Sequence, residues 1–337
     1  MMIIDDQNDK TNVHETRHYV DSSIESLWML FASFAFAIMG VCVKLASSQY
    51  SIFEIVMYRG LIGAVFIYTY IRFQRGSIKT PLPWHHLSRS LIGVTSMWMW
   101  FYSISKLPLA TAMTLNYMSP IWMAAILFVW GWSHGQTRFE WGLVAAIIMS
   151  FVGVILLLRP AMNADLWFGG LVALTSGILA AIAYLQVRHL GQLGEPDTRV
   201  VFYLSVTGLA FGLLGTFFGT NMPADKSLAW HAHSATGIVL LISMGASATV
   251  AQLAMTRAYH LGKTLLTANL QYTGIIFSSL WGILIWSDML SWLGWIGIVV
   301  VLISGVVATF YNTQKFKSEN RGLTTERMAA DPISTEI

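Results

Sequence analysis

Long apolar stretches alternate with short polar segments over most of the chain. The segments between them carry turn signals, such as the Gly194-Glu195-Pro196 run. Each stretch is close to the roughly 20 residues that cross a hydrocarbon core of about 30 Å. The pattern therefore predicts an all-α membrane protein with ten transmembrane helices, at about 27–46, 54–73, 89–105, 111–132, 140–158, 168–187, 200–220, 236–257, 265–286 and 291–311.

Basic residues fall mostly on one side when the chain is threaded with its N-terminus inside. Of the twenty Lys and Arg residues, three lie in outer loops and two, Lys44 and Arg59, lie within helices. The other fifteen lie on the inner side, with Arg89 counted at the start of the third helix. Cytoplasmic loops of membrane proteins carry such an excess. We therefore expect a multi-pass protein of the cell (inner) membrane with both termini in the cytoplasm.

The composition fits a chain that lies mainly in lipid. It is 55% hydrophobic and 11% charged, with a mean hydropathy of +0.59, whereas soluble domains carry about 25% charged residues. Residues 1–26 and 312–337 are polar and are expected to form cytoplasmic tails. The first tail lacks the basic start and apolar run of a cleaved signal peptide. The lone Cys42 excludes an internal disulfide framework.

Motifs typical of other function classes are missing from the sequence. Gly262-Lys263-Thr264 resembles the end of a nucleotide-binding loop, but the position five before Gly262 is Arg257, so the glycine-rich start that cradles phosphates is absent. The loop histidines lack carboxylate or cysteine partners at a spacing that would bind a metal. We expect no ATP-driven transport, no metal or other cofactor and no nucleic-acid partner.

The two halves of the chain resemble each other weakly. Residues 51–63 align with 196–208 at an offset of 145, and Thr111-Ala112 aligns with Thr267-Ala268 at an offset of 156. The matches keep one order along five helices, and because five is odd, the second copy enters the membrane in the opposite sense. We expect two inverted five-helix repeats, over 27–158 and 168–311, with a binding site between them near the midplane. The alternative is that apolar helices resemble each other through composition alone.

The corner between the third and fourth helices carries a family resemblance. Residues 101–112, followed by Ser119-Pro120, resemble the same corner of the EamA family in the drug/metabolite transporter superfamily. Residues 258–262 before Thr267-Ala268 resemble the matching corner of its second repeat, and Lys44 and Arg59 sit where the family commonly has basic residues. The resemblance covers about residues 27–311. It implies ten helices in two EamA-like repeats and export or exchange of small metabolites, often amino acids. The Gly-Glu pair that family members often carry after helices 4 and 9 is missing here.

Two helices carry the main polar clusters within the apolar stretches. The fourth has Asn116 and Tyr117 ahead of Pro120, and the ninth has Asn269, Gln271 and Tyr272. Matching polar clusters in opposed repeats predict a substrate-binding cavity, while the alternative is that interior amides hold helices together. Further candidates for the cavity wall, each of which could instead pack against lipid or neighbours, are Trp98, Tyr102, Tyr184, Gln252 and Trp281.

Arg59 is the cation furthest inside a predicted helix. It either faces the cavity and pairs with a substrate carboxylate, or with Glu54 when the site is empty, or its long stem reaches the outer interface. For Lys44, nearer a helix end, we favour the interfacial position. No acidic residue is expected at mid-depth, which disfavours a central-carboxylate proton relay but leaves coupling through Glu54 or a histidine open.

Together these patterns predict a secondary transporter that moves small metabolites, amino-acid-like or related, across the cytoplasmic membrane by alternating access. Its partners are the metabolite and the lipid bilayer, and it acts as a monomer or homodimer. Export or exchange is favoured by the family resemblance alone. The alternative is an uptake carrier for a scarce metabolite or cofactor. An intramembrane enzyme that acts on lipid would want paired carboxylates or histidines near an interface, and the sequence shows none.

Overall fold

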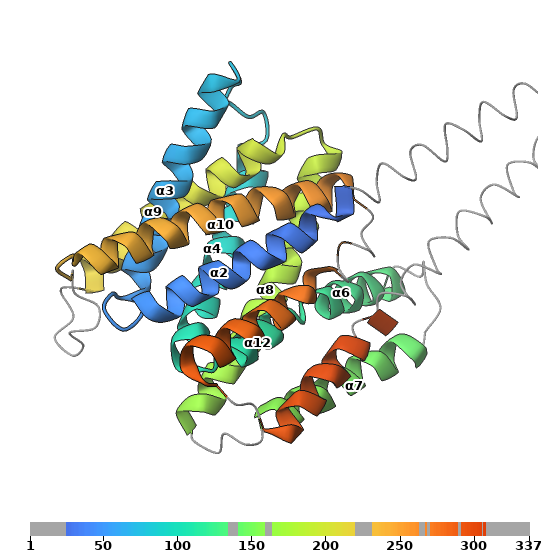
Figure 1. Cartoon of the computed structure of the whole chain (residues 1–337). Coiled ribbons are helices and arrows are strands. Elements are labelled where there is room, and N and C mark those ends of the chain that lie inside the picture. Colours follow the sequence, from blue (N-terminus) through green and yellow to red (C-terminus); the bar gives the residue numbers. More distant parts are fainter. Residues whose placement is uncertain are drawn as a thin grey trace, which may run out of the picture.

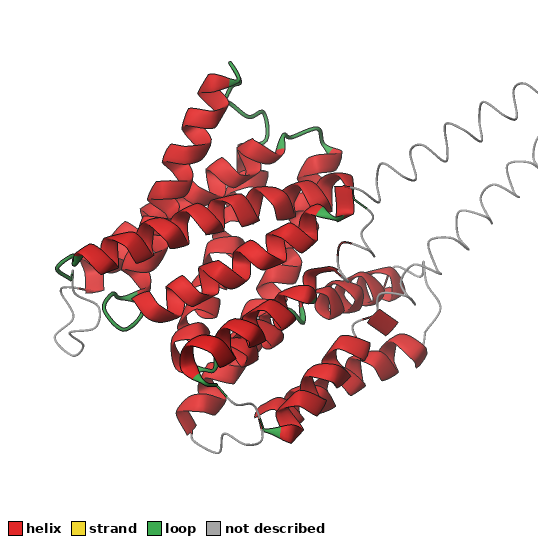
Figure 2. Ribbon diagram, in the orientation of Figure 1, coloured by secondary structure: helices red, strands yellow, loops and turns green. Residues whose placement is uncertain are grey.

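The computed structural model describes residues 25–133, 141–158, 164–219, 231–262, 267, 270–288, 291–304 and 306–307. Within these ranges every regular element is a helix, as Figure 2 shows, so the all-α prediction is confirmed for this part of the chain. The helices (Figure 1) are α2 (Trp28–Ala46), α3 (Ile52–Phe73), α4 (Pro83–Lys106), α5 (Leu109–Asn116), α6 (Ser119–Ser133), α7 (Trp141–Leu158), α8 (Ala164–Gln192), α9 (Asp197–Gly219), α10 (Ala235–Leu261), α12 (Thr273–Trp286) and a last helix over Trp292–Ser304.

Helices from the two halves of the chain pack against each other. α2 lies along α10, α3 lies along α9, and α4 lies along α8 (Figure 1). At one side of the bundle α7 packs against the last helix, where Gly153 approaches Val300 and Val301. The buried core is therefore shared by the two halves.

The outer surface of the bundle is strongly apolar. Large side chains such as Phe217 (66% exposed), Leu284 (73%) and Trp292 (80%) face outward, which is a surface suited to lipid rather than to water. Six described helices are long and apolar enough to cross a membrane, three shorter apolar helices accompany them, and α4 completes the ten expected segments. The chain is a multi-pass membrane protein.

The start of α4 differs from its predicted position. It begins at Pro83 rather than at residue 89, because proline suits the first turn of a helix, where its missing N–H has no partner to lose. The extra turns carry Arg89 well inside the helix, and its side chain is only 2% exposed. Counting Arg89 among the inner-loop cations was therefore wrong.

The predicted fourth helix is broken into α5 and α6. Tyr117 and Met118 form a turn between them, and the amide of Met118 bonds the carbonyl of Leu115 rather than one a full helical turn back. Pro120 follows directly and has no N–H to donate to the carbonyl of Asn116. The break leaves this backbone carbonyl open to contact with neighbouring helices. α8 packs against it at Gly177, where an added Cβ would lie 3.1 Å from the backbone carbonyl oxygen of Asn116.

Small residues set how closely α3 and α9 pack. A Cβ added at Gly60 would lie 2.7 Å from the carbonyl oxygen of Ser205, and one at Gly212 would lie 2.7 Å from the Cα of Met57. Such separations require glycine, since backbone meets backbone. Gly212 therefore permits this close packing, whereas Gly208, four residues earlier, has ordinary van der Waals room.

Candidate functional site

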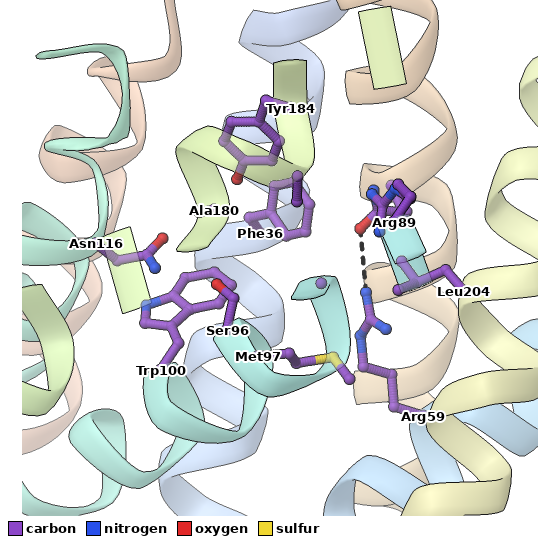
Figure 3. Close-up of a pocket in the computed structure, with 13 residues that line it drawn as sticks. Phe36, Arg59, Arg89, Ser96, Met97, Trp100, Asn116, Ala180, Tyr184 and Leu204 are labelled. Atoms are coloured by element: carbon purple, nitrogen blue, oxygen red, sulfur yellow. Dashed lines mark hydrogen bonds between the residues drawn. The ribbon is translucent and has the colours of Figure 1, made fainter. Parts of the chain in front are cut away.

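A polar cavity lies in the core of the bundle, where seven helices converge (Figure 3). The free space is about 50 Å³, enough for a few water molecules. A metabolite would enter only after one end of the bundle opened. The cavity is lined by Phe36 from α2, Arg59 from α3, Arg89, Gly93, Ser96, Met97 and Trp100 from α4, Asn116 from α5, Ala180, Ala183 and Tyr184 from α8, Leu204 from α9 and Gln252 from α10.

Two arginines line one side of this cavity. Arg59 is 6% exposed and Arg89 is 2% exposed. Arg59 Nη2 donates to Gln252 Oε1 at 3.3 Å. Figure 3 shows Arg59 and Arg89 on the side of the cavity where Leu204 lies. The structure places Arg59 in the cavity and not at the interface. Its expected pairing with Glu54 is wrong, because Glu54 bonds Ser51 and His231 instead.

The opposite side of the cavity is a neutral hydrogen-bonding wall. Asn116 Nδ2 donates to Ser176 Oγ at 2.9 Å, and Ser96 Oγ donates to the carbonyl of Ser176 at 2.8 Å. These bonds hold α4, α5 and α8 together and fix the Asn116 amide at the cavity wall. Asn116 thus combines the two roles considered for it, cavity wall and helix contact.

The predicted site residues divide into three groups. Arg59, Asn116, Tyr184 and Gln252 line the cavity. A second group, Tyr117, Gln271 and Tyr272, lies buried beside it. The Tyr117 ring lies 6.2 Å from the ring of Trp100. Gln271 accepts a hydrogen bond from Tyr259 and donates one to Ser119, and Tyr272 is 4% exposed. A third group packs elsewhere: Trp98 contacts Phe53 and Phe211, Tyr102 contacts Phe168, and Trp281 packs at the edge of the apolar core. Asn269 lies outside the described residues.

One face of α4 was missed by the sequence interpretation. Arg89, Gly93, Ser96 and Trp100 all line the cavity, and their spacing of four, three and four residues places them on a single helical face. The pair chosen from the sequence, Trp98 and Tyr102, lies on other faces. A helix start at Pro83 would have revealed this stripe, since it puts Arg89 inside the helix.

A polar contact closes one end of the bundle above the start of α3. Glu54 is fully buried, its Oε2 accepts from the backbone of Ser51 at 2.8 Å, and the same oxygen lies 2.7 Å from His231 Nδ1. The backbone of His231 also donates to Glu54 Oε1 at 2.8 Å. At the end of α2, Lys44 Nζ pairs with Asp288 Oδ2 at 2.9 Å, a partner that the sequence interpretation did not assign.

Replacing Glu54 with glutamine tests this closure. Glutamine still suits the capping position, so α3 should begin normally, while the charged hydrogen bond to His231 becomes a neutral one. We expect a loss of about 1 kcal/mol, seen as faster hydrogen exchange in residues 231–234 with unchanged exchange at the start of α3. Glu54→Ala, which removes both contacts, should speed exchange in both segments.

The other end of the bundle is held by a cluster around Glu195, which we call the Glu195 cluster: Thr80, His86, Glu195 and Arg199. Thr80 Oγ1 donates to Glu195 Oε1 at 2.7 Å, and Arg199 Nη1 donates to Oε2 at 2.7 Å. His86 Nε2 lies 3.2 Å from Oε2. Burial raises the pKa of the Glu195 carboxyl, but the hydrogen bonds from Thr80 and Arg199, the neighbouring His86 and the Arg199 charge outweigh it and lower the pKa below its ordinary value.

The chain is similar to known transporters. The EamA-like transporter family matches residues 23–159. The pseudopaline exporter CntI of Pseudomonas aeruginosa is 28% identical over 82% of this chain and 94% of its own length. A riboflavin transporter of Vibrio cholerae is 24% identical over 87% of this chain and 95% of its own length, and an S-adenosylmethionine uptake transporter of Rickettsia bellii is 20% identical over 75% and 82%. A solved protein crystal structure shares the fold, with a TM-score of 0.61 and 16% identity over 86% of this chain and 99% of that one.

Proposed function

We propose that this chain, which matches the EamA-like transporter family over residues 23–159 and is similar to known transporters over most of its length, moves small metabolites across the cytoplasmic membrane by alternating access. The observation that carries the proposal is the buried polar cavity between two closed ends. A carrier needs a site that neither side of the membrane reaches when both ends are closed. The Glu54–His231 contact and the Glu195 cluster lie at the two ends where opening would occur.

In this proposal the two inverted repeats are residues 27–158 and 168–311. Each contributes to the cavity: Arg59, Arg89 and Asn116 come from the first, and Tyr184 and Gln252 come from the second. With Arg89 moved into the bundle, fourteen of the twenty Lys and Arg residues stay on the inner side, which supports cytoplasmic termini.

Export or exchange is the proposed direction, and uptake is the second candidate. The relatives include both an exporter and an uptake transporter, and their shared fold serves either direction. The cargo is therefore sought first among amino acids, amines, nucleosides, vitamins and organic acids, without assuming a direction.

Counterflow in proteoliposomes tests the proposed function. Vesicles with the full-length protein are loaded with one unlabelled metabolite class at a time, and entry of the labelled compound is followed. At least one class should accumulate transiently. Vesicles without protein set the background, and no accumulation from any class would contradict the proposal.

Asn116→Ala tests whether the central cavity is the cargo site. Loss of the amide should weaken cargo binding about tenfold, because one buried hydrogen bond is lost and Ser176 loses its partner. Ligand-induced thermal shift measures this, with Tyr272→Ala as a probe of the adjacent wall. Gln74→Ala is the matched control, since Gln74 is an exposed amide that contacts Tyr70 on α3. A shift that survives in Asn116→Ala would move the site away from α5.

A further inference from the structure

Among the described residues, the lining of the central cavity includes two buried cations and no acid. Arg59 and Arg89 line it together, and none of the other lining residues is Asp or Glu. Neither arginine has an ion-pair partner among the described residues. Two unpaired guanidiniums in a low-dielectric core are costly, so their joint presence points to a counter-charge that the protein itself does not supply.

Among the residues that line this cavity, the buried polar atoms without a hydrogen-bond partner are all nitrogen donors. They are Arg59 Nε, Arg89 Nε and Nη1, Trp100 Nε1 and Gln252 Nε2. The Gln252 oxygen accepts from Arg59, which fixes that amide with its nitrogen turned away. A wall that presents several N–H groups and so few open acceptors matches an occupant rich in acceptor oxygens.

The position of the Arg89 guanidinium depends on a glycine one turn along α4. A Cβ added at Gly93 would collide with Arg89 Nη1 and would lie 3.1 Å from Leu204 Cδ1. Glycine at this position therefore leaves room for the guanidinium beside its own helix, at the cavity wall. Because the colliding atom is the end of a flexible side chain, alanine there displaces the guanidinium without breaking the helix.

The two arginines come from consecutive helices. Arg59 is about 10 Å along α3 from its first residue, and Arg89 is about 9 Å along α4 from its own. Phe36, Met97 and Leu204 line the same cavity and supply apolar surface beside the charges. An occupant with charged groups and a hydrocarbon part would satisfy both surfaces.

We infer that the cavity binds a small metabolite with two carboxylates, one on each guanidinium, while its carbon chain lies against the apolar wall. The inference rests on the proposed transport function and names its cargo class. A monocarboxylate would leave one arginine unpaired. A compact phosphate would pair with both arginines but would leave the apolar wall uncovered.

Calorimetric titration of the detergent-purified full-length protein tests this assignment. The probes are succinate and glutarate as dicarboxylates, butyrate as a monocarboxylate, inorganic phosphate as a compact anion and putrescine as a dication. We expect the dicarboxylates to bind at least about tenfold more tightly than butyrate or phosphate, because a charged hydrogen-bonded pair is added. Putrescine should not bind.

The variants assign the effect to the two guanidiniums. Arg59→Gln and Arg89→Gln should each weaken dicarboxylate binding by about 10- to 100-fold and bring it to the level of butyrate. Gly93→Ala should weaken it less, through displacement of Arg89 alone. Arg72→Gln, an exposed cation on α3, should leave binding unchanged. Each variant is first checked for a monodisperse elution peak, and Gly93→Ala keeps the test open if an arginine variant does not fold.

The outcomes separate this inference from the proposed function. Butyrate or phosphate binding as tightly as the dicarboxylates, or dicarboxylate binding that survives in both arginine variants, would overturn the two-carboxylate assignment. If no anion binds but a neutral or cationic metabolite gives counterflow that Asn116→Ala weakens, the cargo class is wrong and the transporter stands. If neither titration nor counterflow responds to any compound, both proposals fall.

Discussion

Gly60→Ala is expected to destabilise the bundle by about 3 kcal/mol, because the added methyl group meets backbone atoms of the neighbouring helix. The added Cβ would lie 2.7 Å from the Ser205 oxygen and 2.9 Å from the carbonyl carbon of Gly208, and it would collide with the backbone nitrogen of Leu209. These are backbone atoms of α9, so no side-chain rotation relieves the clash, and α3 and α9 must move apart. The thermal midpoint in detergent should fall by roughly 5–10 °C.

A neighbouring glycine of α9 provides the matched control. At Gly208 the nearest atoms to an added Cβ are the Met97 methyl at 3.7 Å and a Val94 methyl at 3.8 Å. Gly208→Ala should therefore be tolerated. The higher helix propensity of alanine should add a few tenths of a kcal/mol of stability, which offsets any small crowding. Gly212→Ala, which meets the backbone of Met57 at 2.7 Å, should resemble Gly60→Ala. Equal midpoints for all three variants would show that α3 and α9 do not approach this closely.

Glu195→Ala is expected to cost about 3–5 kcal/mol of stability at its end of the bundle. The carboxylate is 2% exposed and is shared by Thr80, His86 and Arg199. Without it, Arg199 and His86 lose their anionic partner at a buried position, and the 74–82 connection loses its tie to the start of α9. We expect faster hydrogen exchange in residues 74–82 and a lower thermal midpoint.

Glu195→Gln separates the charge from the hydrogen bonds. The amide can still accept from Thr80, so this variant should lose less stability than the alanine variant. If Glu195→Ala leaves exchange in residues 74–82 unchanged, the cluster does not close this end of the bundle. Arg257, which pairs with Glu25 at an exposed position, gives the comparison, since Arg257→Gln should change stability by less than about 1 kcal/mol.

The same cluster gives a pH dependence of definite sign. The pKa of Glu195 is lowered in the folded protein from its ordinary value of 4.5. The stabilisation is therefore fully present above that ordinary value and is lost as the pH falls through the lower folded-state pKa. The midpoint of the wild type should decline as the pH is lowered below about 4.5, and the decline should be shallower in Glu195→Gln. A steeper decline in the variant would contradict this assignment.

Much of the architecture could be predicted because the membrane imposes simple rules on sequence. A helix that crosses about 30 Å of hydrocarbon must be long and apolar, so stretches such as 27–46 and 236–257 predicted α2 and α10 within a few residues. Arg59, Asn116, Tyr184 and Gln252 could be chosen as candidates because polar groups inside a span are costly.

Other features depended on contacts that no single segment contains. The break after Asn116 depends on Pro120 together with the packing of α8 against it. His231, which contacts Glu54, lies in a loop 177 residues further along the chain. Lys44, which we expected at the interface, pairs with Asp288, which lies 244 residues further along the chain. Pairings of this kind are decided by how the helices assemble, since each charge has several possible partners along the chain.

The sequence by itself determined which segments span the membrane, which residues are too polar to face lipid and which family the chain resembles. Only the tertiary structure decided which face of each helix turns inward: on α4 it is the face of Arg89 and Trp100, and not that of Trp98 and Tyr102. The physical reason is that lipid and protein interior are both apolar, so a membrane helix carries little hydrophobic asymmetry to mark its buried side. Rotation is set by close packing and by the few polar contacts between helices, and these exist only once the bundle has formed.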